Sequence, residues 1–313
     1  MSFGNDLRTQ YSGQAPAPLW SHSSTGGIER GLGTPSILRS PKGFLKLSHI
    51  HGFQRWRERL RLPARVATKA MASWQFDRRP VNDFVRWIDD WIGDGCSPRN
   101  EIPEISAWLR LGARRFQEEA VWGVFLYTCA GGLSGAKVLR EACGSWRRFR
   151  RDWRPRGSRA FKKGMVHCVD HRKYCGQEDT LAAIRSYVSL MKHRGGQVRF
   201  LAASRAAADP FHELFQELQN VPSFGRLAAW DYLTRVNGTR ALPFKIEPRR
   251  LYLRGSTGPL RAFQRLCRIP GNGDVEDGGL ELYALVRART RNIRNLVDLE
   301  DALCIWQKRR DDC

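Results

Sequence analysis

The sequence predicts a mostly α-helical protein, and three observations support this. After residue 48, apolar residues recur at steps of three and four, the spacing of a helix with one buried face. Continuous alternation of apolar and polar residues, which is typical of strands, is hard to find. The pair Asp209-Pro210 supplies an N-cap followed by a proline that the first helical position tolerates.

The chain divides into two regions of different composition. Residues 1–48 are rich in Gly, Ser and Pro and have no apolar periodicity, so we expect a flexible arm there. Residues 49–313 are expected to form one helical domain. Its apolar stripes predict helices over the following ranges: 53–62, 81–92, 105–116, 121–126, 133–143 and 180–192.

Two further helices form a candidate helix-hairpin-helix over residues 209–236. The first carries an apolar stripe from Phe211 to Leu218, and the second starts at Arg226 after a turn that contains Gly225. The first-turn amides of the second helix would face outward, where the helix dipole favours a DNA phosphate. The residues expected to contact DNA here are Asn220, Val221, Ser223, Phe224, Gly225 and Arg226.

The charge of the chain points to nucleic acid. Its 313 residues include 53 Lys and Arg against 31 Asp and Glu, a formal charge of +22. The longest uncharged apolar run, residues 120–133, is glycine-broken and too short to cross a bilayer. The amino terminus lacks the pattern of a secretory signal, so we expect a cytoplasmic protein whose eight cysteines are reduced.

A basic run with interleaved aromatic residues covers residues 146–163. We expect it to follow DNA phosphates, through a set that includes Arg147, Arg148, Arg150 and Arg151. The alternative is a solvated helix face whose aromatic side chains lie in the core.

The hairpin and the segment after it resemble the helix-hairpin-helix DNA glycosylases. Residues 218–228 are similar to the hairpin of that superfamily, although its first glycine is replaced and Gly225 remains. The resemblance implies a two-lobed helical fold with a cleft. It also implies an essential acid about twenty residues after the hairpin, which here is Glu247, a glutamate where the superfamily usually has aspartate. Leu227 occupies the position of the Schiff-base lysine in bifunctional members, so β-lyase chemistry is not expected.

The carboxy-terminal third resembles a narrower group. Residues 250–259 and 299–304 are similar to the glutamyl/putrescinyl-thymine pyrophosphorylases of phage DNA hypermodification and to their antiphage glycosylase relatives. The resemblance implies handling of a bulky modified base. The residues assigned to a base pocket are Tyr252, Arg254, Ser256, Thr257 and Gly258. The turn at 254–258 could equally be a simple connection.

Two carboxylates are the catalytic candidates. A carboxylate beside C1′ of a flipped nucleotide would stabilise positive charge on the sugar and orient water. Glu247 is the first choice, with helix capping as the alternative. Asp231, on the second hairpin helix, comes second, and it could instead be a solvated charge.

The leading prediction is therefore a monofunctional DNA glycosylase that excises a hypermodified base in antiviral defence. One alternative is a phage-type transferase that replaces pyrophosphate on an activated thymine in DNA. Another is a DNA-binding protein without catalysis. The expected partner is double-stranded DNA with modified bases, and no membrane or obligate protein partner is expected.

No cofactor and no metal are expected. Walker A, G-x-G-x-x-G, H-E-x-x-H and G-x-S-x-G motifs do not occur in the sequence. His167, Cys168, His171 and Cys175 have spacings reminiscent of a metal site, but zinc usually takes two separated pairs of ligands. We therefore favour isolated side chains over a zinc site.

Overall fold

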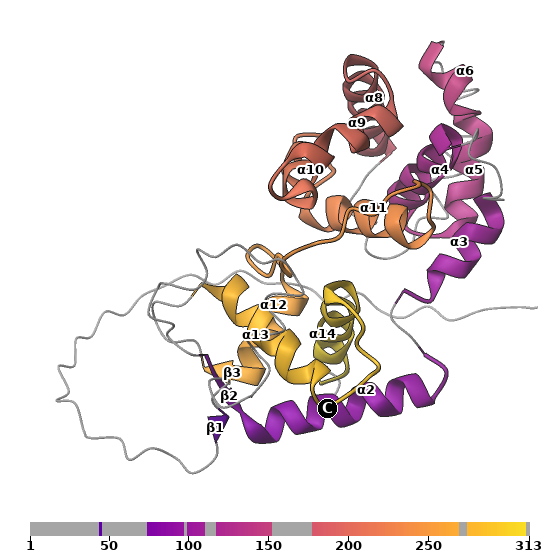
Figure 1. The fold of residues 1–313 in the computed structure, drawn as a ribbon. Coiled ribbons are helices and arrows are strands. Elements are labelled where there is room, and N and C mark those ends of the chain that lie inside the picture. Colours follow the sequence, from indigo (N-terminus) through magenta and orange to yellow (C-terminus); the bar gives the residue numbers. More distant parts are fainter. Residues whose placement is uncertain are drawn as a thin grey trace, which may run out of the picture. The chain divides into compact units, whose positions relative to one another are not determined.

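The computed structural model is mostly helical, which confirms the predicted fold class. It describes residues 44–45, 74–96, 99–109, 117–151, 177–268 and 274–310, which belong to a compact unit from Lys42 to Cys313. Figure 1 shows the arrangement of its helices. None of the described helices is both long and apolar enough to cross a membrane.

The middle of the chain builds a first hydrophobic core. Its helices are α3 (Glu101–Leu109), α4 (Gln117–Ala130), α5 (Leu133–Cys143), α6 (Trp146–Arg151), α8 (Gln177–His193), α9 (Gln197–Ala203), α10 (Pro210–Gln219) and α11 (Arg226–Gly238). Helix α4 lies at its centre, where every residue from Ala120 to Ala130 is buried. A helix that is apolar all round is stable only when other elements surround it, and α5, α9 and α11 all pack against α4.

The two ends of the described chain build a second core. It contains α2 (Arg78–Gly93), α12 (Gly258–Leu266), α13 (Val275–Arg287) and α14 (Leu296–Arg310). Helices α12 and α14 lie side by side. Three short strands form a small antiparallel sheet in the order β1 (Phe44–Leu45), β2 (Gln75–Asp77) and β3 (Cys267–Arg268), which the sequence did not predict.

The chain passes from the second core to the first between α2 and α3, and it returns at residues 251–253. Leu251 and Leu253 belong to the second core, whereas Tyr252 belongs to the first. Tyr252 has a positive φ of 54°, a conformation that is uncommon for a residue with a side chain. This left-handed residue therefore lies where the chain passes from one core to the other.

Helix bounds follow the local sequence. Helix α2 buries Val81, Phe84, Val85 and Ile88 at the predicted spacing. Helix α3 was expected over 105–116 but starts at Glu101, where two acidic residues in the first turn suit the helix dipole. The expected helix at 53–62, the arm at 1–48 apart from β1, and the cluster from His167 to Cys175 lie outside the described residues.

Candidate active site

The two helices expected on either side of the hairpin turn are present as α10 and α11. Asp209 accepts a hydrogen bond from the backbone N–H of His212 and caps α10, and Pro210 occupies its first turn. After the turn, α11 begins at Arg226 with Gly225 as its N-cap, and no side chain caps that end. Ser223, in the turn, has a positive φ of 57°. The first turn of α11 is thus free of side-chain caps.

A pocket of about 780 Å³ opens beside the start of α11. Its wall combines the turn before α3, helices α4, α11 and α14, and the loop before α12. Both cores therefore contribute to the pocket. Pockets of this size and mixed lining commonly bind small molecules.

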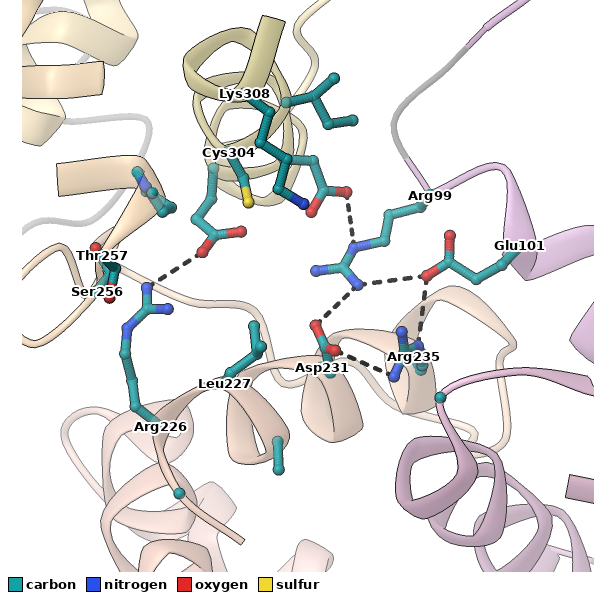
Figure 2. Close-up of a pocket in the computed structure, with 18 of the residues that line it drawn as sticks. Arg99, Glu101, Arg226, Leu227, Asp231, Arg235, Ser256, Thr257, Cys304 and Lys308 are labelled. Carbon is teal, nitrogen blue, oxygen red and sulfur yellow. Dashed lines mark hydrogen bonds and ion pairs between the residues drawn. The ribbon is translucent and has the colours of Figure 1, made fainter. Parts of the chain in front are cut away.

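One arginine connects three carboxylates in this pocket (Figure 2). Arg99 Nη1 lies 3.4 Å from Glu101 Oε1 and 3.4 Å from Asp231 Oδ1, and Arg99 Nε lies 2.9 Å from Asp301 Oδ2. These carboxylates come from α3, α11 and α14. Arg99 adopts a positive φ of 55°, a backbone conformation that is uncommon for a residue with a side chain.

A second arginine closes the network on the α11 side. Arg235 Nε lies 3.4 Å from Glu101 Oε1, and Arg235 Nη1 lies 3.3 Å from Asp231 Oδ2. Its guanidinium also lies over the ring of Tyr127, 5.2 Å from the ring centre. Both oxygens of Asp231 therefore face arginines.

A separate ion pair joins α11 to α14. Arg226 Nη2 lies 3.2 Å from Oε1 of Glu300, and Arg226 Nε donates to the carbonyl of Tyr252 at 2.8 Å. The Glu300 side chain is 4% exposed. In Figure 2 the side chain of Arg226 lies beside Ser256 and Thr257. Arg226, expected on the DNA-facing turn, thus bridges the two cores.

Burial and charge act in opposite directions on these groups. Burial raises the pKa of Asp301 to about 8, although Arg99 opposes the rise. Burial also raises the pKa of Glu300, with Arg226 and Arg99 opposing it. Burial lowers the pKa of Arg99, but Asp301, Asp231 and Glu101 outweigh burial and hold it above its usual value. The pocket thus holds a carboxyl group that titrates near neutral pH.

The structure does not bring Glu247 to this pocket. Its side chain is 69% exposed and lies 3.4 Å from the ammonium of Lys245. Asn237 fixes the neighbouring backbone, because its side chain accepts from the N–H of Ile246 at 2.9 Å and donates to the carbonyl of Ile246. With Ile246 buried, Glu247 faces outward. Asp231, the second candidate, lines the pocket.

The five residues assigned to a base pocket separate into two groups. Ser256, Thr257 and Gly258 line the pocket. Tyr252 is buried in the first core, where its ring contacts Phe211, Phe215 and Trp230. Arg254 is exposed and lies 3.5 Å from Asp274. An aromatic cluster thus holds Tyr252 away from the pocket.

The predicted DNA contacts also differ in exposure. Within the turn, Asn220, Ser223 and Gly225 are exposed, whereas Val221 and Phe224 are buried in the first core. On α6, Arg147, Arg148, Arg150 and Arg151 are exposed, while Trp146 and Phe149 are buried. The rest of the basic run, residues 152–163, lies outside the described residues.

Sequence reasoning missed most of the charged residues in the pocket. They are Arg99, Glu101, Arg235, Glu300, Asp301 and Lys308. One signal was present, since Glu300 and Asp301 fall within the 299–304 segment on which the pyrophosphorylase resemblance was based. Arg99 and Arg235 carried no such signal, because the partners that place them in the pocket include residues distant in sequence.

The comparisons with known proteins give a family. The model of the amino acid:DNA transferase family matches residues 99–313, more than half of the chain. The chain therefore belongs to the amino acid:DNA transferase family, which is related to DNA modification. No curated protein and no solved structure is significantly similar to it.

Proposed function

We propose that this protein modifies DNA by transferring an amino acid onto an activated base. The observation that carries the proposal is that the family match begins at Arg99 and includes the whole charged network of the pocket. The family supports the transferase alternative better than base excision. Helix-hairpin-helix membership and excision both remain predictions.

The chemistry of transfer can be stated from the atoms involved. An amino acid attacks as a free amine, so its ammonium must first lose a proton. In the pyrophosphorylase-like reaction, the nitrogen attacks the methylene carbon of the activated thymine. The new C–N bond forms as the C–O bond breaks, and pyrophosphate leaves with the electron pair. A site for this reaction needs a proton acceptor and cationic groups for the leaving group.

The pocket offers both kinds of group. Asp301 and Asp231 line it, and so does Lys308. Lys308 is exposed and forms no ion pair within the described part of the chain, so it is available to an anionic leaving group. Because a base in a duplex is unreachable, the target nucleotide must rotate out of the helix. The volume of about 780 Å³ falls in the range of known ligand pockets.

The DNA would be held where the start of α11 lines the pocket. The uncapped start of α11 presents backbone amides that suit a phosphate. Leu227, in the first turn of α11, lines the pocket and is 37% exposed. An extruded base placed against Leu227 would cover this apolar surface. These contacts at the start of α11 would serve DNA binding in both the transfer and the excision reactions.

A product analysis tests the proposal. An oligonucleotide carrying pyrophosphorylated 5-hydroxymethyluracil would be incubated with the protein and mixed amino acids, then digested to nucleosides for mass spectrometry. We expect a nucleoside heavier by an amino acid, together with released pyrophosphate. The same duplex with plain thymine should remain unchanged. Abasic sites would instead establish excision, and unaltered DNA would reject both enzymatic functions.

A further inference from the structure

Two aspartates line the pocket, and they differ in how their oxygens are occupied. Asp231 Oδ1 faces Arg99 and Asp231 Oδ2 faces Arg235, at 3.4 and 3.3 Å. Asp301 has one ion-pair partner among the described residues, Arg99, whose Nε lies 2.9 Å from Oδ2. The Asp301 side chain is 18% exposed. Asp301 Oδ1 is thus left for a ligand in the pocket.

We propose that Asp301 accepts the proton from the ammonium group of the incoming amine, and that Arg99 is a positioning residue that orients Asp301 and favours its ionised form. This inference rests on the proposed transfer reaction. In the step, one N–H bond breaks and its proton moves to Asp301 Oδ1, leaving the nitrogen with a lone pair. That nitrogen then attacks the methylene carbon, and pyrophosphate leaves. The proton on Asp301 finally passes to water.

The other pocket groups suit this step less well. Glu300 is more deeply buried, and its Oε1 faces Arg226. Glu101 Oε1 lies 3.4 Å from both Arg99 and Arg235. Burial raises the pKa of the Cys304 thiol to about 11, so the thiol keeps its proton near neutral pH. Glu101 has similar access, with 21% of its side chain exposed, but it faces two arginines, whereas Asp301 faces only Arg99 among the described residues.

The burial of Asp301 and the charges around it suit a proton acceptor near neutral pH. Burial is the main cause that raises the pKa of Asp301 to about 8, and Arg99 opposes it. An acceptor whose pKa lies near the working pH is the most effective general base. The other titratable or charged groups that line the same pocket are Glu101, Tyr127, Arg226, Asp231, Arg235, Glu300, Cys304 and Lys308. An ammonium ion bound at Asp301 would lower its pKa further toward neutrality.

The first experiment compares two nucleophiles in Asp301→Asn. An amino acid at pH 7 is protonated, whereas hydroxylamine is mostly neutral and needs no base. We expect the variant to lose about 100-fold or more of its rate with the amino acid and to keep most of its rate with hydroxylamine. DNA affinity, measured by fluorescence anisotropy, should stay unchanged. Asp90→Asn, an exposed change on α2 outside the pocket, is the matched control.

Equal losses with both nucleophiles would overturn the assignment of Asp301, and so would an unchanged rate with the amino acid. Neither result would affect the proposed transfer activity, because the wild-type protein would still form the adduct. If the wild-type protein formed no adduct with either nucleophile, the proposed function itself would fail, and this inference with it.

The second experiment tests Arg99 through the pH dependence of the rate. The wild-type rate should rise with pH as Asp301 loses its proton. Arg99→Gln removes the cation that opposes protonation, so the rise should move to higher pH, and Arg99→Lys should move it less. A purely structural role would lower the rate without moving the curve, and that result would reject Arg99 as a positioning residue. Arg194→Gln, whose ion pair with Glu217 lies outside this pocket, serves as the control.

Discussion

Asp231 and Glu247 show how different the surroundings of two carboxylates can be. Asp231 lies in the pocket between two arginines, and removing its charge would leave Arg99 and Arg235 short of a partner. A buried charge left with no counter-ion costs about 3–5 kcal/mol, and here the cost should be smaller because Arg99 keeps Glu101 and Asp301 while Arg235 keeps Glu101. Glu247 pairs at the surface with Lys245, and such pairs contribute about 0–1 kcal/mol.

This difference predicts a large effect for one amide substitution and almost none for the other. Asp231→Asn should lower the transfer rate at least tenfold and reduce stability, because the arginines of the pocket lose a charged partner. Glu247→Gln should change the transfer rate by less than about twofold. It should change the free energy of unfolding by about 1 kcal/mol or less. Initial rates and thermal unfolding of the two variants measure this directly. A large loss of rate in Glu247→Gln with normal folding would return the catalytic role to Glu247.

At the scale of the element, Gly278 lies where the backbone of α13 packs closely against two aromatic side chains. A Cβ at this position would lie 2.5 Å from the Trp74 ring and 2.7 Å from the Phe263 ring. Both rings are buried and cannot move aside easily, and overpacking of this kind costs about 1–3 kcal/mol.

Gly278→Ala should therefore lower the free energy of unfolding by about 1–3 kcal/mol. Gly93→Ala, at the end of α2 with nothing within 4 Å of the added methyl group, should be neutral or stabilising by up to about 1 kcal/mol. Urea unfolding of both variants makes the comparison. Equal free energies of unfolding for the two variants would mean that the Trp74 and Phe263 rings move aside to make room for the methyl group.

Helix α13 also carries Glu281, whose carboxyl group titrates near neutral pH. Burial raises the pKa of Glu281 from 4.5 to about 7, although the backbone N–H of Trp74 donates a hydrogen bond to it. The folded state therefore holds this proton more tightly than the unfolded chain does. Its contribution to stability is complete below about pH 4.5 and is lost as the pH rises through 7.

Glu281→Gln removes this titration. The wild-type protein should lose stability relative to the variant between about pH 5 and pH 8. Thermal unfolding at intervals of one pH unit gives the measurement. A constant difference in melting temperature across that range would show that Glu281 does not change its charge there.

Sequence patterns predicted the helices well because each helix is specified locally. The apolar spacing in α2 and the Asp209-Pro210 start of α10 depend on neighbours within one or two turns. The site depends on residues far apart in sequence, since the fold brings Arg99 to Asp231 and Asp301. Glu247 was chosen by its spacing from Gly225, but spacing does not fix the direction of a side chain.

At the scale of the whole molecule, the net charge of +22 favours an anionic partner such as DNA. Helix α6 presents Arg147, Arg148, Arg150 and Arg151 to solvent while its aromatic residues are buried. Each phosphate contact adds about 0.9 to the slope of log affinity against log salt concentration.

Changing these four arginines to glutamine should therefore weaken DNA binding and flatten that slope, by about 0.9 for each lost contact. Fluorescence anisotropy with a duplex at several salt concentrations supplies the slope. The matched control for charge changes four other exposed arginines to glutamine. They are Arg78, Arg79, Arg86 and Arg291. An unaltered slope in the α6 variant would remove this helix from the binding surface.

The buried stretch from Ala120 to Ala130 decides how the molecule can be cut for study. A truncation ending at residue 151 would keep α4 but lose α9 and α11, two of the helices that pack against it. Its apolar surface would then meet water, and such fragments should aggregate. Shortened versions therefore need to retain α3 through α11 as one block, and fragments that end inside it should be recovered as insoluble material.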